Sequence, residues 1–420
     1  MLYRKVKKTG EELSILGFGC MRLPQKRGRI DEERATRQVR LAIDRGVNYI
    51  DTAMPYHMGS SEPFLGRALT DGYRGRVNLA TKLPPGLVNT RSDMDRLLGA
   101  QLDMLNTDRI DYYLLHGING DSWGKLRRLG VLEFLDRAKG DGRLRFRGFS
   151  FHGDIDSFKE IVDAYDWDVC LIQYNYLDEH NQAGTEGLRF AAAKGMGVII
   201  MEPLRGGNLG GKVPSAVRAV WDEADVRRSP AEWALRWIWN HPEVTVVLSG
   251  MNREDHIEEN LRVAAEALPG SLSERELEIV SRASETYRSL MKVGCTGCRY
   301  CMPCPSGVNI PVCFETYNNM HLFGDKAVSK VLYQLRLGAL EGSGAPSYAS
   351  LCEKCGACEE ACPQHLPIQD LLEEVVRDFE GRGSKLLGRA VNAFLGIVKF
   401  RAYRRARRVE KRKNSFSSGS

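Results

Sequence analysis

LGFG (16–19) and DEERATRQVRLAIDRGVNYID (31–51) predict a strand, a helix and a second strand in succession. Asp31 is a residue type that starts helices, and Gly46 stands where a helix would stop. The run NYID (48–51) that follows has strand character. Apolar residues recur at helical spacing between the two ends, at Ala35, Val39, Ala42 and Ile43. The segment is therefore predicted to form one strand–helix–strand unit.

The same alternation continues to about residue 269. Eight short runs are strand candidates: LGFG (16–19), NYID (48–51), VNLAT (77–81), DYYLL (111–115), LRFRGFS (144–150), VCLIQY (169–174), VIIM (198–201) and VTVVL (244–248). Eight strand–helix units over about 250 residues match an α/β fold of the (β/α)8 TIM barrel type. An open doubly wound sheet is the alternative, but no GxGxxG follows the first strand. We place the barrel in residues 1–290, with 1–15 as a hairpin beneath it and 271–290 as a closing helix.

Composition narrows the class of protein. The chain has 420 residues, of which 43% are apolar and 27% charged, with a net charge of +6. These values exclude a mainly disordered, collagen-like or multi-span membrane chain. The first residues, MLYRKVKKTGEEL, lack the apolar centre of a secretion signal, so we expect a cytoplasmic protein.

Cysteines are concentrated in one part of the chain. Two lie in the first 290 residues, and the other nine lie between Cys295 and Cys362. Clustered cysteines in a reducing compartment predict metal ligands rather than disulfides. The run at 352–363 has the spacing C-x2-C-x2-C-x3-C-P, and the run at 295–305 repeats it with one residue fewer before the last cysteine. We assign residues 291–384 to this second, cysteine-bearing domain.

The paired cysteine runs resemble those of bacterial two-cluster ferredoxins, in which the fourth cysteine of each run ligates the other cluster. The resemblance implies a ferredoxin-like domain with two [4Fe–4S] clusters. One would be held by Cys295, Cys298, Cys301 and Cys362, and the other by Cys352, Cys355, Cys358 and Cys304. Cys313 is the substitute ligand for Cys304, or else a buried thiol. Two structural zinc sites are the alternative for the whole domain.

Four polar side chains stand at or just after three neighbouring strand ends. They are Asp51, Tyr56, Lys82 and His116. Catalytic residues of barrels of this type lie at this end of the strands. An ammonium beside a phenol lowers the pKa of the phenol, a carboxylate keeps the ammonium charged, and a histidine can orient a carbonyl oxygen. The set suits donation of a proton to an oxygen that is becoming an alkoxide.

These residues lie in segments that resemble the aldo/keto reductase family. The segments are DTAMPYHMGSSEPFLGRAL (51–69), ATK (80–82), DYYLLH (111–116), IQYN (172–175) and SPAEWALRW (229–237). The resemblance implies reversible hydride transfer between a nicotinamide cofactor and a carbonyl or alcohol. Tyr56 would be the proton donor, Lys82 and Asp51 would tune it, and His116 would orient the substrate.

The resemblance also implies positions for the nicotinamide cofactor, NADP or NAD. Ser150 and Gln173 would hold the carboxamide, and Met201 occupies the place of a stacking aromatic ring or belongs to the barrel packing. The loop with Leu204, Arg205 and Gly206 would approach the pyrophosphate. Ser249, Asn252 and Arg253 are the polar candidates near the 2′-position, and Glu259 and Asn260 would contact the adenine.

The final segment, residues 385–420, is predicted to be a basic amphipathic helix with a flexible end. Between Lys385 and Lys413 it has 11 basic residues and one acidic residue. The helix either folds on its own domain or makes peripheral contact with an anionic membrane surface or a partner. The sequence does not favour nucleic-acid binding, because aromatic residues are few there.

Two functional interpretations follow from the fused arrangement. In the first, the barrel acts on a small-molecule carbonyl or alcohol, and the clusters exchange single electrons with a ferredoxin or flavoprotein partner. In the second, the chain is an electron-transfer or nucleotide-sensing adapter whose barrel does not turn over and whose clusters are structural.

Overall fold

The computed structural model describes residues 1–207, 209–211, 213–295, 301–338, 345–362 and 366–381. By their contacts these residues form two compact units. Among the described residues, the first consists of 1–210 and 228–274, and the second of 211–227 and 275–381. The second unit thus takes in residues 211–227 and 275–290, which the sequence analysis assigned to the barrel domain. The predicted tail, 385–420, lies outside the described residues.

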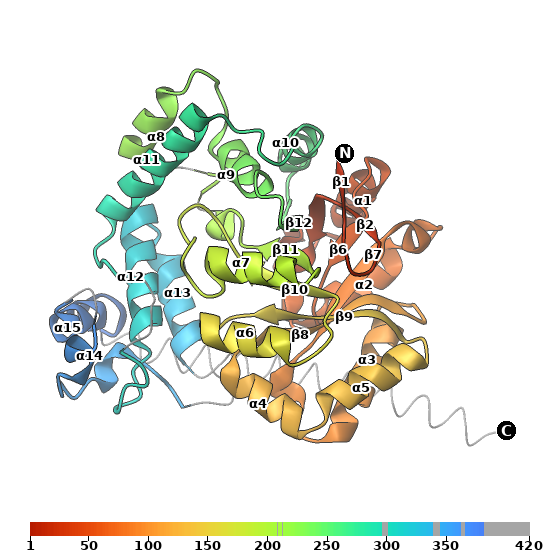
Figure 1. Ribbon diagram of the computed structural model, residues 1–420, viewed down its shortest axis with the longest axis horizontal. Coiled ribbons are helices and arrows are strands. Elements are labelled where there is room, and N and C mark those ends of the chain that lie inside the picture. Colours follow the sequence, from red (N-terminus) through yellow and green to blue (C-terminus); the bar gives the residue numbers. More distant parts are fainter. Residues whose placement is uncertain (208, 212, 296–300, 339–344, 363–365, 382–420) are drawn as a thin grey trace. The chain divides into compact units, whose positions relative to one another are not determined.

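Parallel strands of the first unit close into a barrel in the order β10-β11-β12-β3-β6-β7-β8-β9 (Figure 1). Within the described residues these strands are β3 (Leu16–Gly19), β6 (Tyr49–Asp51), β7 (Asn78–Leu83), β8 (Ile110–Ile118), β9 (Leu144–Phe151), β10 (Val169–Gln173), β11 (Gly197–Met201) and β12 (Val244–Ser249). The predicted (β/α)8 barrel is confirmed, and each predicted strand is present.

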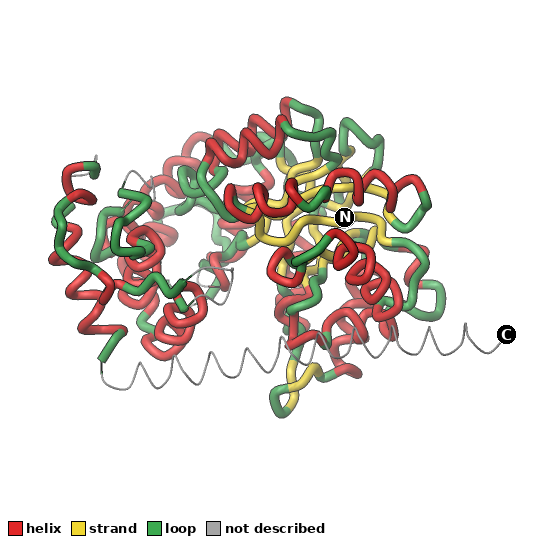
Figure 2. The backbone as a smooth tube through the Cα atoms, turned by 90° about the horizontal axis from the view of Figure 1, so that it is seen from below, coloured by secondary structure: helices red, strands yellow, loops and turns green. Residues whose placement is uncertain are grey.

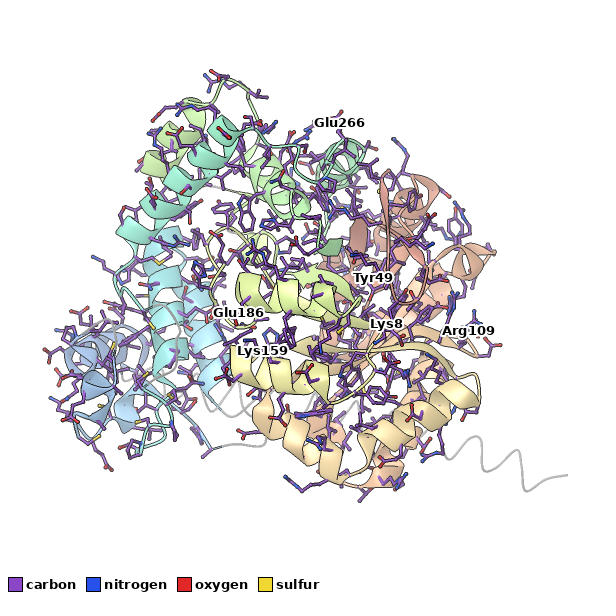
Figure 3. All side chains as sticks on the ribbon, in the orientation of Figure 1. Lys8, Tyr49, Arg109, Lys159, Glu186 and Glu266 are labelled. Carbon is purple, nitrogen blue, oxygen red and sulfur yellow. The ribbon has the colours of Figure 1, made fainter. Side chains whose placement is uncertain are left out.

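Helices surround the ring of strands, as the red and yellow segments of Figure 2 show. They are α1 (Glu32–Asp44), α2 (Ser61–Ala68), α3 (Arg91–Met104), α4 (Gly120–Arg128), α5 (Val131–Gly140), α6 (Ile155–Asp163), α7 (Gly184–Ala193), α9 (Pro230–Trp239) and α10 (Glu254–Ala264). Asp31 caps the N-terminus of α1 through its side chain, as the sequence predicted, and Ser229 caps α9 in the same way. On the outer surface, Lys159 of α6 pairs with Glu186 of α7 (Figure 3).

An N-terminal hairpin closes one end of the barrel. Its strands β1 (Tyr3–Lys5) and β2 (Glu12–Ser14) pair antiparallel. Val6 and Leu13 are buried in one apolar cluster with Tyr49 and Val169, the first residues of β6 and β10. The hairpin therefore fills the end at which strands begin, and the end at which they finish is left for polar side chains.

Helices make up most of the second unit. They are α8 (Ser215–Asp222), α11 (Glu274–Leu290), α12 (Ile310–Phe323), α13 (Lys326–Leu337), α14 (Ala357–Glu360) and α15 (Ile368–Phe379). The sequence analysis did not identify α12 and α15. Tyr333 of α13 stacks on Phe379 of α15 with ring centroids 4.5 Å apart. No helix among the described residues of either unit is long and apolar enough to cross a bilayer.

Candidate active site and cysteine centre

The four predicted catalytic side chains stand at the finishing ends of adjacent strands. Asp51 is the last residue of β6, and Tyr56 begins a short 3-10 helix, η2 (Tyr56–Gly59), five residues later. Lys82 and His116 were predicted to follow their strands, but they lie inside them, because β7 extends to Leu83 and β8 to Ile118. The longer strands hold both side chains on rigid backbone.

Lys82 is the centre of this group. Its side chain is 1% exposed, and its Nζ lies 2.6 Å from Oδ1 of Asp51 and 3.3 Å from the hydroxyl oxygen of Tyr56. The backbone carbonyl of Thr52 accepts a third hydrogen bond at 2.8 Å. An ammonium group has three donors and no acceptor, so every N–H of Lys82 is used.

This arrangement fixes the direction of the Tyr56 hydroxyl. Because Lys82 can only donate, the oxygen of Tyr56 accepts the bond between them. The proton of the hydroxyl is then left to be donated to another oxygen. A tyrosine held in this way is oriented as a proton donor.

Burial opposes the acidity that the sequence analysis predicted. It raises the pKa of Tyr56 above its ordinary value, and the field of Lys82, which lowers that pKa, does not outweigh it. The expectation of a lowered pKa is therefore wrong for this structure. Burial also raises the pKa of Asp51, although Lys82 opposes the shift. Burial works against the charge on Lys82, but Asp51 and Tyr56 outweigh it, and the pKa of Lys82 is raised.

His116 lies beside the phenol in a neutral state. Its ring centroid is 6.0 Å from that of Tyr56, and the two rings meet edge to face at 83°. Burial, followed by the charges of Lys82 and His152, lowers the pKa of His116 to about 3. At neutral pH the imidazole therefore carries no charge and acts through hydrogen bonding.

A buried network that the sequence analysis missed lies next to Lys82. Oε1 of Glu62, on α2, accepts hydrogen bonds from Thr81 at 2.6 Å and from Gln101 at 2.7 Å. The same amide of Gln101 donates to the carbonyl of Lys82 at 3.0 Å. Because α2 follows the loop that carries Tyr56, Glu62 connects that loop to the strand of Lys82. The signal in the sequence that could have identified Glu62 was its position six residues after Tyr56.

Two predicted carboxamide-binding residues finish neighbouring strands. Ser150 of β9 accepts a hydrogen bond from the backbone N–H of Gly117 at 2.6 Å. Gln173, the last residue of β10, donates to Asp178 at 3.1 Å and accepts from Gln182 at 3.0 Å. A primary amide has two donors and can accept twice, so Gln173 retains capacity for a ligand.

The other predicted cofactor residues follow β11 and β12. Met201 ends β11 and packs against the barrel's apolar cluster, and Leu204, Arg205 and Gly206 form the loop after it. Ser249 ends β12 and accepts from Asn260 at 2.9 Å, while Glu259 accepts from Ser229 at 2.5 Å. Arg253 forms two hydrogen bonds with Asp255, at 2.9 and 2.6 Å. These residues therefore share the barrel end that carries Lys82.

Residues 15–275 match the pattern described as the Aldo/keto reductase family, and residues 294–367 match the 4Fe-4S dicluster domain. The first match covers more than half of the chain. The chain belongs to the aldo/keto reductase family. It is an oxidoreductase of that family with a 4Fe-4S domain joined to the barrel.

Individual relatives of this aldo/keto reductase match its barrel. L-galactose dehydrogenase of Arabidopsis thaliana is 26% identical over 68% of this chain and 95% of its own length. The NADH-specific methylglyoxal reductase of Escherichia coli is 26% identical over 66% of this chain and 96% of its own. The solved structure of aldo-keto reductase AKR11C1 from Bacillus halodurans superposes with a TM-score of 0.57, at 25% identity, over 67% of this chain and 96% of its own.

The second unit brings predicted cluster ligands from different cysteine runs together. Cys304, Cys352 and Cys358 are partly buried and pack against the same apolar core. Cys304 belongs to the first cysteine run, and Cys352 and Cys358 belong to the second. The predicted crossed ligand set requires cysteines of the two runs to lie close together. Cys313 is fully buried, with its sulfur 4.0 Å from the hydroxyl oxygen of Tyr333. Ligation by any of these cysteines stays a prediction.

The remaining predicted ligands differ in burial. Cys362 is 8% exposed, Cys295 and Cys301 are half-buried against the same apolar core, and Cys355 is exposed. Cys298 lies outside the described residues. No three His, Cys, Asp or Glu side chains of the described part are close enough to hold a single metal ion. A four-iron cluster holds its thiolates farther apart, because each binds a different iron atom, so the donor set fits that group.

Glu62 provides a test of the buried network through stability. Burial raises the pKa of Glu62 to about 7, so folding disfavours its charged form. The stability it contributes is complete below about pH 4.5, where it is protonated in both states, and is lost as pH rises through 7. The loss should approach roughly 3 kcal/mol. The free energy of unfolding of Glu62→Gln, measured in urea, should therefore rise relative to that of the native chain when the pH is changed from 5 to 8.

Glu160→Gln on the surface of α6 is the matched control, since Glu160 is 62% exposed. It should show no such gain. A Glu62→Gln variant whose stability follows that of the native chain at both pH values would contradict the raised pKa.

Proposed function

We propose that the barrel catalyses reversible hydride transfer between a nicotinamide cofactor and a small carbonyl or alcohol substrate. The observation that carries the proposal is the position of Lys82, hydrogen-bonded to both Asp51 and the Tyr56 hydroxyl at the finishing ends of the strands. A bound dihydronicotinamide supplies the hydride for the carbonyl carbon. Tyr56 supplies the proton for the carbonyl oxygen, which completes the alcohol.

The neighbours of Tyr56 support this division of roles. A phenol that keeps its proton at neutral pH is poor at releasing it until a stronger base forms beside it. The oxygen becomes such a base as it gains negative charge, and the ammonium of Lys82 then stabilises the phenolate that is left. Neutral His116 can hold the substrate oxygen by a hydrogen bond, so that it faces Tyr56.

The loops after β11 and β12 support the proposal that the cofactor is a dinucleotide. One guanidinium nitrogen of Arg205, Nη1, is buried and has no hydrogen-bond partner among the described residues. A buried donor of this kind is costly unless an acceptor reaches it, and a phosphate oxygen is such an acceptor. Barrels of this class frequently bind phosphate at the loops that follow strands seven and eight.

NADH is our choice between the two nucleotides. Arg253, the basic candidate near the 2′-position, is already bonded to Asp255, and Glu254 and Asp255 both lie in the first turn of α10. These carboxylates would repel the 2′-phosphate that distinguishes NADPH. One relative of this barrel is named as NADH-specific, which agrees with the choice.

We also propose that the second unit holds two [4Fe–4S] clusters, with the crossed ligand sets that the cysteine spacing predicts. The relatives above align with about two-thirds of this chain over nearly all of their own length. The cysteine unit is therefore an addition to a barrel of full size. Because the barrel reaction moves two electrons as a hydride, added clusters suit single-electron exchange with a ferredoxin or flavoprotein.

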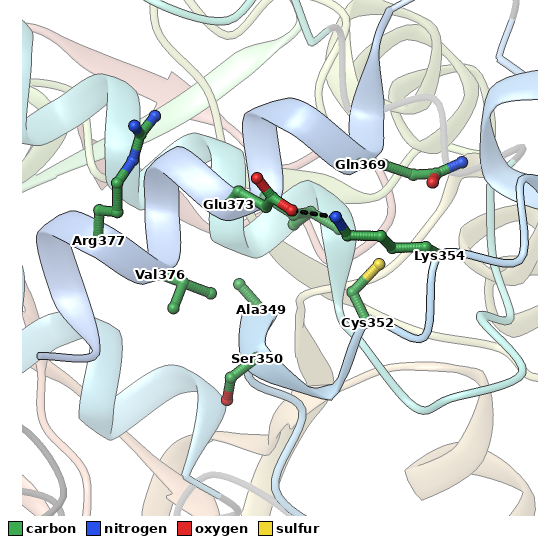
Figure 4. A pocket seen from close by; sticks show the side chains of 9 residues that line it. Ala349, Ser350, Cys352, Lys354, Gln369, Glu373, Val376 and Arg377 are labelled. Carbon is green, nitrogen blue, oxygen red and sulfur yellow. Dashed lines mark ion pairs between the residues drawn. The ribbon is translucent and has the colours of Figure 1, made fainter.

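An open cleft beside Cys352 would give such a partner access. Its volume is about 400 Å³, and the Lys354–Glu373 ion pair lies at its wall (Figure 4). The exposed Cys355 belongs to the same cysteine run. The adapter with structural clusters remains the alternative, and it requires that the clusters stay oxidised when nucleotide, substrate and partner are supplied.

Tyr56→Phe tests the proton donor. Removing the hydroxyl should lower the rate of carbonyl reduction by about 10²–10⁴-fold, because general acid catalysis is lost. The affinity for NADH should change little. Tyr73→Phe is the control, since that hydroxyl donates to Asp44 on the surface, at 3.1 Å. Near-normal reduction by Tyr56→Phe, measured as NADH consumption with a panel of aldehydes and ketones, would contradict the assignment.

Cys304→Ser tests the clusters independently of the barrel. The native chain, purified without oxygen, should contain about eight iron atoms and eight sulfides. Cys304→Ser should lose up to half of both, whereas Cys313→Ser should retain them, because Cys313 is not a predicted ligand of the crossed sets. Iron and sulfide analysis gives the result. Loss in Cys313→Ser with full content in Cys304→Ser would show that Cys313 is the ligand.

A further inference from the structure

Arg22 lies at the barrel end that carries Lys82, but no role has been assigned to it so far. It ends the 3-10 helix η1 (Cys20–Arg22), directly after β3. Its side chain is exposed, and its guanidinium makes no hydrogen bond or ion pair with any residue that the structure describes. An exposed arginine alone indicates no site, but the side chain of Arg22 extends over two neighbouring loops of the barrel.

The side chain of Arg22 passes close to two glycines, Gly250 and Gly206. A Cβ built on Gly250, directly after β12, would lie 3.1–3.4 Å from the Cβ, Cγ and Cδ atoms of Arg22. A Cβ built on Gly206, in the loop after β11, would lie 3.2 Å from Nη2 of Arg22. The aliphatic stem therefore lies along Gly250, and the guanidinium reaches Gly206. Larger residues at either position would crowd the arginine.

The guanidinium thus meets the loop that carries Arg205. The Arg205 side chain is 10% exposed, and its Nε lies 3.3 Å from Oδ2 of Asp178. Its buried Nη1 has no partner among the described residues. The loop after β11 therefore meets the Arg22 guanidinium at Gly206 and carries, on the preceding residue Arg205, a buried guanidinium nitrogen with no partner among the described residues. Paired guanidinium groups of this kind are a common means of binding phosphate oxygens.

A carboxylate also lies near Gly206, and it restricts the class of ligand that can bind there. Oε2 of Glu202 would be 3.7 Å from a Cβ on Gly206. A carboxylate repels an isolated phosphate, but it can accept a hydrogen bond from a ribose hydroxyl. A diphosphate flanked by ribose, as in a dinucleotide, presents both groups at once. The surroundings of Gly206 therefore favour a dinucleotide over inorganic phosphate.

We propose that Arg22 is a diphosphate-binding residue of the dinucleotide site and acts with Arg205 at Gly206. The inference rests on the proposed function, because it assumes that a nicotinamide dinucleotide is the ligand. It also makes a distinct claim. NADH and NADPH share the diphosphate, so Arg22 must contribute equally to both, whereas a residue that binds the 2′-phosphate would contribute to NADPH alone.

The test is to titrate the full chain, purified without oxygen, with NADH and with NADPH. Binding is monitored by the fluorescence of the nucleotide, which gives the affinity for each. Arg22→Gln should weaken the affinity for NADH and the affinity for NADPH by a similar factor, about 10–100-fold, as expected for loss of a hydrogen bond from a charged group. Arg22→Lys should fall between the native chain and Arg22→Gln. Arg29→Gln on β5 (Arg29–Ile30) is the control, because it removes the same charge from an exposed residue nearby, and it should change neither affinity.

The outcomes separate the two proposals. If the native chain binds neither nucleotide, the proposed function and this inference both fail. If it binds them and Arg22→Gln binds both equally well, only the role of Arg22 is overturned. Selective loss of NADPH would also overturn it, since Arg22 would then bind the 2′-phosphate. Circular dichroism of each variant confirms that a loss of affinity does not come from unfolding.

Discussion

The site depends on one buried ion pair, between Lys82 and Asp51. An unpaired ammonium in the interior would cost several kcal/mol or lose its proton. Here a carboxylate, a backbone carbonyl and a phenol oxygen take all three of its donors. The pair keeps Lys82 charged, and the charged Lys82 in turn fixes the direction of the Tyr56 hydroxyl. Without the pair, Tyr56 would have no fixed donor beside it.

The barrel provides the rigidity that this pair needs. The N-terminal hairpin fills one end with apolar side chains, and the four polar residues of the site stand at the other end. Glu62 then connects α2 to the strand of Lys82 through Thr81 and Gln101. Asp51 and Lys82 come from neighbouring strands, and the parallel register places Asp51 beside Ala80. The pairing of β6 with β7 thus brings together residues that are 31 positions apart in the sequence.

Local patterns predicted the barrel and the place of its four polar residues, because strand ends can be read from short apolar runs. The electrostatic balance at Tyr56 was not predictable in the same way. The sequence showed a cation beside a phenol, but burial, the larger effect, comes from the whole fold. Arg22 was missed although it follows the first strand, since only the folded loops show that it reaches Gly206. In the second unit, neither α12 nor α15 has a side chain that caps its N-terminus, whereas Asp31 caps α1.

Transfer of deuterium is the most direct measurement of the central claim. The full chain would be incubated without oxygen with NADH in which both hydrogens at C4 of the nicotinamide are deuterium, together with an aldehyde that it consumes. Deuterium should appear on the carbinol carbon of the product, and Lys82→Met should form no such alcohol. NADH oxidation that leaves the product carbon free of deuterium, or undiminished transfer by Lys82→Met, would contradict the account.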